Sequence, residues 1–221
     1  MTRNDTMIRA MLAAGPAGAP LIGAGSNDTG SNDTGARPDA ADADSIVLSP
    51  ESRQLLAAWQ DWRGDRLLPH RRDMNLVSIS RLMPQLALIE LYGPDRAVFR
   101  LAGTELEQLY GATLTGRSYI TMVPPERRQR RGERLWQIAT RPCAAVQRSF
   151  LDWQSGRHHE LELLCLPILP DDPGRPVQVL GIGSRMPQRP WGIREHANDP
   201  VTAINSRRID LIDIGAGLPH I

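Results

Sequence analysis

Lysine is absent from this 221-residue sequence, cysteine occurs only twice, and no apolar run is long enough to cross a membrane. Two cysteines cannot form a disulfide framework or a four-ligand zinc site. A membrane-spanning helix needs about 20 consecutive apolar residues, so we expect no membrane segment. The charges of the 26 arginines and the 25 acidic residues nearly cancel, to a net charge of +1. The overall charge therefore does not indicate binding to nucleic acid or to a membrane surface. Hydrophobic residues make up 41% of the chain, which is enough for a globular core.

Apolar anchors are scarce in residues 1–48. A stretch rich in Ala, Gly and Pro is followed by two copies of Ser-Asn-Asp-Thr-Gly, at 26–30 and 31–35. These residues favour turns and bury little surface, which predicts a disordered, low-complexity tail. The chain start has the basic and apolar letters of a secretory signal, but Asp5 interrupts the basic part and Gly and Pro break the apolar part. We therefore expect no export and a cytoplasmic protein.

An amphipathic helix is predicted where the folded part begins. Positions 49–51 hold a serine that can cap the helix, a proline suited to the first turn, and a glutamate that favours the positive end of the dipole. Leu55, Trp59 and Trp62 then share one face at helical spacing, and Gly64 ends the helix. This face has two interpretations. It covers the core of its own domain, or it is an interface that pairs with a second copy or another protein.

Alternation of apolar residues predicts a sheet of five strands. The first two strands are joined by a short turn and form an antiparallel hairpin. The third and fourth strands are also joined by a short turn, at Ser155 and Gly156. The predicted strands are Gln85–Tyr92, Ala97–Ala102, Cys143–Trp153, His159–Ile168 and Val177–Ser184.

The segment between the two hairpins is predicted to be helical. We expect a short helix at Glu105–Tyr110, a second small helical segment opening at 115–117, and a longer helix from Pro124 to about Ala139. The fold class is therefore α+β: a five-stranded antiparallel sheet with short helices on one face, preceded by the amphipathic helix. Residues 187–221 form a C-terminal extension, in which Arg208–Ile214 has the character of an edge strand.

Several short runs of the sequence resemble one known family. They are Trp62–Asp65, Leu68–Pro69, Arg71–Asp73, Leu82–Pro84, Phe99–Thr104, Tyr110–Gly111 and Leu114–Gly116, with Gly156, Glu160 and Leu166–Pro167 in the later hairpin. Together with the element order they resemble a PAS domain, and more specifically the small stand-alone bacterial PAS proteins. The resemblance runs from about Leu55 to Ser184, within a predicted domain at 49–186.

This resemblance implies a non-enzymatic sensory or interaction module. Such modules bind a small ligand between the sheet and the helices, or dimerise through the sheet and the flanking helix. The implied partners are a second copy of the chain or a separate signalling protein. No cofactor is carried over, because the segment from Gly103 to Ala139 contains neither His nor Cys for haem ligation or a flavin adduct.

Four residues are candidates for a ligand pocket. Phe99, Tyr110 and Trp136 either line a cavity or pack in the core. Arg100 either forms a cross-strand ion pair with Glu90 or points inward, where its guanidinium would bind an anionic ligand.

Reactive groups give no catalytic or metal site. His158 and His159 stand at a turn without converging partners, and Cys143 and Cys165 lie on strands, where Cys usually behaves as a small apolar residue. The run 127–134 contains five arginines and one glutamate. It is either a solvated helix face that can meet an acidic partner, or a nucleic-acid contact. A nucleic-acid-binding protein and an enzyme of unidentified reaction therefore remain the alternatives.

Overall fold

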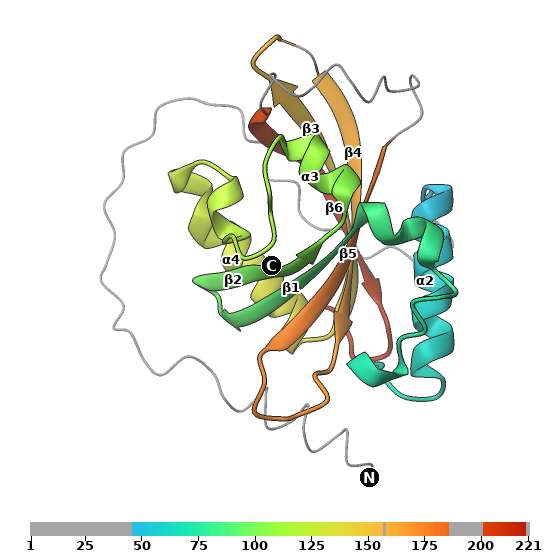
Figure 1. The fold of residues 1–221 in the computed structure, drawn as a ribbon. Helices are drawn as coiled ribbons and strands as arrows, with labels where there is room; N and C mark the ends of the chain where they lie inside the picture. The colour runs from blue at the N-terminus through green and yellow to red at the C-terminus, as the bar shows by residue number, and fades with distance from the viewer. Residues whose placement is uncertain (1–45, 157, 186–200, 220–221) are drawn as a thin grey trace, which may run out of the picture.

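The computed structural model describes residues 46–156, 158–185 and 201–219. Nearly all of the predicted tail (1–48) and the connection at 187–200 lie outside these residues. Figure 1 shows a central twisted sheet with helices on both sides.

The sheet has six strands in the order β2-β1-β5-β4-β3-β6, and every neighbouring pair is antiparallel. The strands are β1 (Leu86–Gly93), β2 (Arg96–Ala102), β3 (Cys143–Trp153), β4 (His158–Ile168), β5 (Val177–Arg185) and β6 (Val201–Asp213). The predicted α+β fold with an antiparallel sheet is confirmed. The five predicted strands are β1 to β5, and β6 extends the sheet at the β3 edge, where Cys143 pairs with Asp213 and Trp153 with Val201.

The other edge of the sheet is covered by the chain segment that follows helix α3 (Thr104–Tyr110). Gly116 N–H donates to Phe99 O, Phe99 N–H to Arg117 O, and Tyr119 N–H to Ala97 O, at 2.8–3.0 Å. The predicted helical segment at 115–117 is therefore wrong. An open strand edge offers unpaired N–H and C=O groups, and Gly116, at φ 84°, lets the chain turn to meet them. The helical turn comes later, as η4 (Ile120–Met122).

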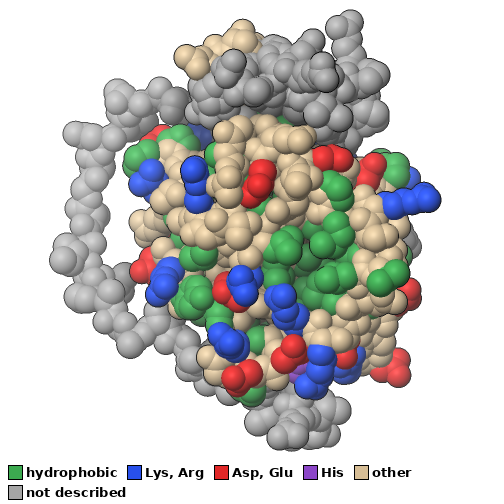
Figure 2. Space-filling model, in the orientation of Figure 1, with side chains coloured by type: hydrophobic (Ala, Val, Ile, Leu, Met, Phe, Trp, Pro, Cys, Tyr) green, Lys and Arg blue, Asp and Glu red, His purple; other side chains and the backbone are tan. Residues whose placement is uncertain are grey.

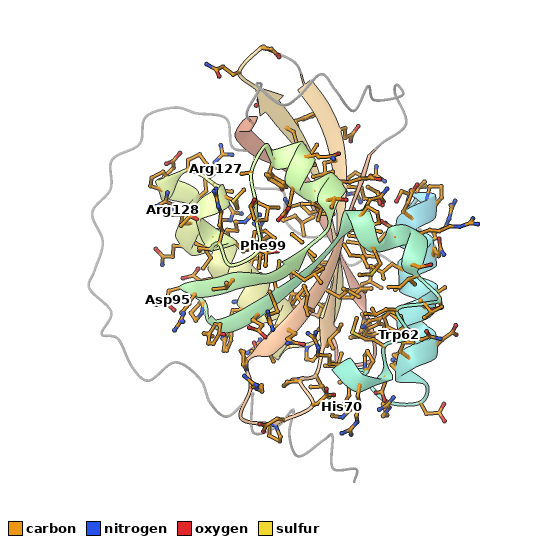
Figure 3. All side chains as sticks on the ribbon, viewed as in Figure 1. Trp62, His70, Asp95, Phe99, Arg127 and Arg128 are labelled. Atoms are coloured by element: carbon orange, nitrogen blue, oxygen red, sulfur yellow. The ribbon has the colours of Figure 1, made fainter. Side chains whose placement is uncertain are left out.

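Helices cover the two faces of the sheet differently. Helix α2 (Pro50–Arg63) packs on one face, here called the outer face. Helices α3 (Thr104–Tyr110) and α4 (Pro125–Thr140) pack on the opposite, inner face. Two 3-10 turns, η2 (Arg71–Asp73) and η3 (Ser80–Gln85), connect α2 to β1. The sheet therefore separates two apolar clusters, and Figure 3 shows Phe99 on the α4 side and Trp62 on the α2 side.

Candidate functional site

The three predicted interface residues lie on the chain's own outer face. Leu55, Trp59 and Trp62 are 0%, 1% and 8% exposed and pack in one cluster with residues of β3, β4 and β5. The indole N–H of Trp59 donates to Pro167 O at 3.0 Å, which fixes the ring against β4. In this structure the apolar face of α2 therefore covers the core of its own domain. While α2 is docked, these side chains offer almost no surface to a partner.

A buried carboxylate holds the N-terminus of α2. Glu162 of β4 is fully buried, and its Oε1 accepts a hydrogen bond from the Ser49 backbone N–H at 3.0 Å. Arg148 Nη2 lies 3.9 Å from Glu162 Oε2 and also donates to Val47 O at 2.7 Å. A carboxylate at this position is favoured by the positive end of the helix dipole. Sequence reasoning missed this contact; its one signal was a glutamate between leucines on a strand that is apolar on both faces.

On the outer face of β5, Ser184 adds a second polar contact to the same helix. Its hydroxyl lies 3.5 Å from the hydroxyl of Ser52, and both residues are buried. We call Ser49, Ser52, Arg148, Glu162 and Ser184 the α2 latch. It places hydrogen-bonding groups at one end of a contact that is mainly apolar and also contains the hydrogen bond from Trp59 to Pro167 O.

The inner face has small residues where the outer face has large ones. One row of paired positions crosses four strands and consists of Ala87, Gly181, Cys165 and Ala145. Gly181 is partly exposed although Leu180 and Ile182 beside it are buried against the outer face. A Cβ built at Gly181 would have only the backbone oxygens of Leu164 and Ala87 within 4 Å. The inner side of Gly181 therefore has no side chain in contact with the position of a Cβ, and we call this place the hollow.

Four partly exposed side chains lie over the inner face, on α3, on α4 and before η4: Tyr110, Tyr119, Arg131 and Trp136. The Phe99 ring meets Tyr119 edge-on, with centroids 5.6 Å apart. The Arg131 guanidinium lies 3.9 Å from the centroid of the Tyr119 ring, which is a cation–π contact. Three of the four candidate pocket residues, Phe99, Tyr110 and Trp136, belong to this one cluster. Their role in ligand binding stays a prediction.

Arg100, the fourth candidate, is on the other side of the sheet. The pairing of β1 with β2 shifts register between Leu88 and Ile89, which leaves Arg100 in a bulge. Its side chain is 63% exposed, and its Nε lies 3.9 Å from Glu90 Oε1. In this structure Arg100 makes the cross-strand contact with Glu90 and does not point inward, and its role in ligand binding stays a prediction. Arg100 instead lines an outer pocket of about 410 Å³ together with Glu90 and Gln178.

Arg131 takes the inward position that Arg100 does not. It lies on the side of α4 that also carries Leu135 and Ile138, both of which are buried. The sequence held this signal, because residues 131, 135 and 138 share one helical face. The surrounding run of arginines concealed it.

Burial keeps the hydroxyl and thiol groups of this region protonated at neutral pH. It raises the pKa of Tyr110 to about 12, and it raises that of Tyr119 as well, against the opposing charge of Arg131. Burial also raises the pKa of Cys165 to about 11 and of Cys143 to about 12. Thiols in this state are poor nucleophiles, whereas the phenol groups remain hydrogen-bond donors.

The basic run 127–134 does not form one continuous surface. Arg131 turns toward Tyr119, and Arg128 Nε donates to Val123 O at 3.3 Å. Figure 3 shows Arg127 and Arg128 at the start of α4, and Figure 2 shows basic and acidic side chains interspersed on this face of the molecule. This pattern differs from the uniform basic stripe of a nucleic-acid-binding protein.

The following absences concern only residues 46–156, 158–185 and 201–219. They contain no group of three or more His, Cys, Asp or Glu that could hold a metal ion, and no helix with the length and apolar character to cross a bilayer. The side chains of His158 and His159 lie outside the described part of the chain.

The chain was compared with known families and structures. A family model described as PAS domain matches residues 47–184. The PAS domain of an HTR-like protein from Haloarcula marismortui is 15% identical, with a TM-score of 0.30, over 52% of this chain and 98% of that one. No curated protein matches the chain. Because the family model covers more than half of the sequence, this chain belongs to the PAS domain family, a family of sensory and signalling modules.

Proposed function

We propose that this chain is a PAS-type signalling module whose output is the docking and release of helix α2. The observation that carries the proposal is the α2 latch: a fully buried Glu162 that accepts a hydrogen bond from the Ser49 backbone N–H, at the start of a mainly apolar helix contact. The proposal assigns no catalysis to the chain. A cytoplasmic location remains a prediction from the sequence.

Release of α2 has a cost that a ligand or partner can offset. Burying one large apolar side chain contributes about 1.5–3 kcal/mol, and Leu55, Trp59 and Trp62 are all buried by docking. Breaking a buried ion pair costs about 3–5 kcal/mol when one partner is left unpaired. Docked and released states are thus separated by several kcal/mol, which a binding partner with differential affinity can overcome.

The released state would expose the partner surface. Leu55, Trp59 and Trp62 would then be free to contact a second copy or a separate signalling protein, as anchors of a kind common in interfaces. The predicted interface role of these residues belongs to that state. Their burial in the docked state explains how the contact could be switched on and off.

The latch is tested by the substitution Glu162→Ala, with Glu160→Ala as the matched control on the same strand. We expect amide hydrogen exchange in α2 to become roughly 100-fold faster in Glu162→Ala, because Ser49 and Arg148 lose their buried partner. Exchange in β1 should stay unchanged. Light scattering should also show a larger dimer fraction. Equal α2 exchange in the two variants would refute the proposal.

A further inference from the structure

The outer pocket lies at the end of the sheet away from the α2 latch, and charged side chains line most of it. Glu90 of β1 and Gln178 of β5 are paired neighbours in the sheet, and Arg100 comes from β2. The other charged groups are Arg71 of η2 and residues of the loop 169–176 between β4 and β5. Separate parts of the fold therefore bring charge to one cavity.

Backbone hydrogen bonds tie η2 to the loop that follows β4. The Arg71 N–H donates to Leu169 O, and the Leu169 N–H donates to Pro69 O, each at 3.0 Å. The carboxylate of Asp171 accepts from the Arg72 backbone N–H at 2.9 Å. The backbone around the pocket is thus held in place before any ligand binds, which lowers the ordering cost of binding.

The acidic side chains of the pocket already accept hydrogen bonds from the chain itself. Glu90 accepts from Gln178 Nε2 and from the hydroxyl of Tyr92, both at 3.2 Å. Asp171 and Asp172 each accept from a backbone N–H at 2.9 Å. These carboxylates therefore belong to the framework of the pocket.

The guanidinium groups of the pocket lack such partners. Arg71, Arg100 and Arg175 are exposed, and within the described part of the chain none of them donates a side-chain hydrogen bond. Among the same residues, the carboxylate within ion-pair distance of these groups is Glu90, 3.9 Å from Arg100 Nε and too far for a hydrogen bond. Each guanidinium carries five N–H donors. The pocket therefore has more charged donors than acceptors to match them.

The arrangement of the donors favours phosphate over carboxylate. The three arginines come from η2, from β2 and from the β4–β5 loop, so they reach the pocket from separate elements. A carboxylate offers two oxygens in one plane, whereas a phosphomonoester offers three free oxygens on a tetrahedral centre. Such a group can accept from three guanidinium groups at once.

The rest of the pocket indicates an uncharged polar remainder of the ligand. Its three arginines are balanced by three acidic residues, which disfavours a purely anionic polymer. Gln178 is 4% exposed, and its Oε1 is buried without a hydrogen-bond donor among the described residues. A hydroxyl is a donor of the kind that this oxygen lacks. The volume of about 410 Å³ is typical of small-molecule sites and exceeds what a phosphate group fills.

We infer that the outer pocket binds a small phosphomonoester of a polyhydroxyl compound, a sugar phosphate in chemical class. Its phosphate lies on Arg71, Arg100 and Arg175, and its hydroxyl groups lie toward Glu90 and Gln178. The inference deepens the proposed function by naming its input, and rests on that function only in treating the ligand as a signal. The pocket is placed for this role, because η2 belongs to the segment that follows α2 and Arg66 in that segment pairs with Asp73 at 2.7 Å.

Calorimetric titration of the full chain tests the inference, with ribose 5-phosphate and glucose 6-phosphate as probes. At least one ester should bind saturably, free ribose and glucose should not bind, and inorganic phosphate should bind at least tenfold more weakly than the ester. No saturable binding of either ester, or equal binding of the ester and inorganic phosphate, would overturn the inference. Tighter binding of a phosphoserine pentapeptide than of both esters would assign the pocket to a protein partner and overturn it as well.

Exposed arginines allow the phosphate end to be tested without disturbing the core. Arg71→Gln and Arg175→Gln should each weaken binding of the ester by roughly 10- to 100-fold, and Arg175→Lys, which keeps the charge and loses the planar fork, by less. Arg53→Gln, at an exposed position of α2 outside the pocket, is the matched control and should leave binding unchanged. Unaltered binding to both Arg71→Gln and Arg175→Gln would refute the site.

The hydroxyl end is tested by Gln178→Met, which keeps the length of the side chain and removes its polar atoms. Binding of the ester should weaken by roughly 3- to 10-fold, whereas binding of inorganic phosphate should stay the same. An ester that binds this variant as tightly as the unaltered protein would refute the proposed orientation.

Hydrogen exchange with and without the bound ester separates this inference from the proposed function. Saturable binding that slows or speeds exchange in α2 supports both. Saturable binding without any change in α2 supports the pocket and contradicts α2 as the output. Absence of binding refutes the pocket alone, because the comparison of Glu162→Ala with Glu160→Ala needs no ligand.

Discussion

The two faces of the sheet come from the same strands and are packed in opposite ways. The outer-face residues of β4 and β5 are large and between 0% and 3% exposed: Leu164, Leu166, Ile168, Leu180 and Ile182. On the inner face the same two strands bury Leu161 and Val179 but also present Leu163, Cys165 and Gly181, all partly exposed. The outer face is close-packed under α2, whereas the inner face is less closely packed at Gly181. The two faces of one sheet thus differ in how closely their middle is packed.

Strand β4 joins the two sides physically. It presents Glu162 to the start of α2 and Cys165 to the hollow. Strand β5 likewise contacts both sides. Its Ser184 lies against Ser52 of α2, and its Gly181 lies on the inner face. A displacement of either strand by a ligand on the inner face would reach the α2 latch through a single layer of backbone, because close-packed sheets transmit strain.

The largest effect is expected on the outer face. Trp59→Ala should lower the free energy of unfolding by about 3–5 kcal/mol, because a large buried ring and its hydrogen bond to Pro167 are lost. Urea denaturation measures the change, and Gln60→Ala, at the exposed neighbouring position, is the control. A loss below about 1 kcal/mol would mean that α2 contributes little to the fold, and the comparison of the faces would fail.

A smaller effect is expected where the inner face is filled. A Cβ at Gly183 would lie 2.7 Å from Leu106 Cδ2 and 3.4 Å from Leu163 Cδ2. Gly183→Ala should therefore lower stability by about 1–3 kcal/mol through overpacking against α3. Thermal unfolding followed by circular dichroism measures it. A rise in stability would show that α3 sits loosely on the sheet and that the hollow extends beneath it.

The strands were predictable from sequence because their signals are local. Alternating apolar residues and short turns placed β1 and β3 within a residue of their observed bounds. The capped start of α2 was equally clear: Ser49 caps the helix, with its Oγ accepting from Ser52 N–H. These features depend on nearest neighbours in the chain, so tertiary contacts did not alter them.

The site was less predictable because it depends on non-local packing. Arg100 faces outward where β1 and β2 change register, and no sequence pattern marks that bulge. Arg131 faces inward because of how α4 rotates against the sheet, while its neighbour Arg130 is exposed. Residues 115–117 hydrogen-bond to β2 instead of forming a helix, since a free strand edge lies within reach. Contacts between segments distant in sequence decided Arg100 and residues 115–117, whereas Arg131 had a local signal in its helical face shared with Leu135 and Ile138.

The smallest effect is also the most direct test of the hollow. Gly181→Ala should raise the free energy of unfolding by about 0.4–1 kcal/mol, because alanine restricts the unfolded chain and its methyl group meets no side chain within 4 Å. The position needs no positive φ, so the backbone is not strained by the change. Urea denaturation of Gly181→Ala and Gly183→Ala should give changes in the free energy of unfolding of opposite sign, although both glycines lie on the inner face of β5. A destabilised Gly181→Ala would show that this part of the inner face is as closely packed as the outer one.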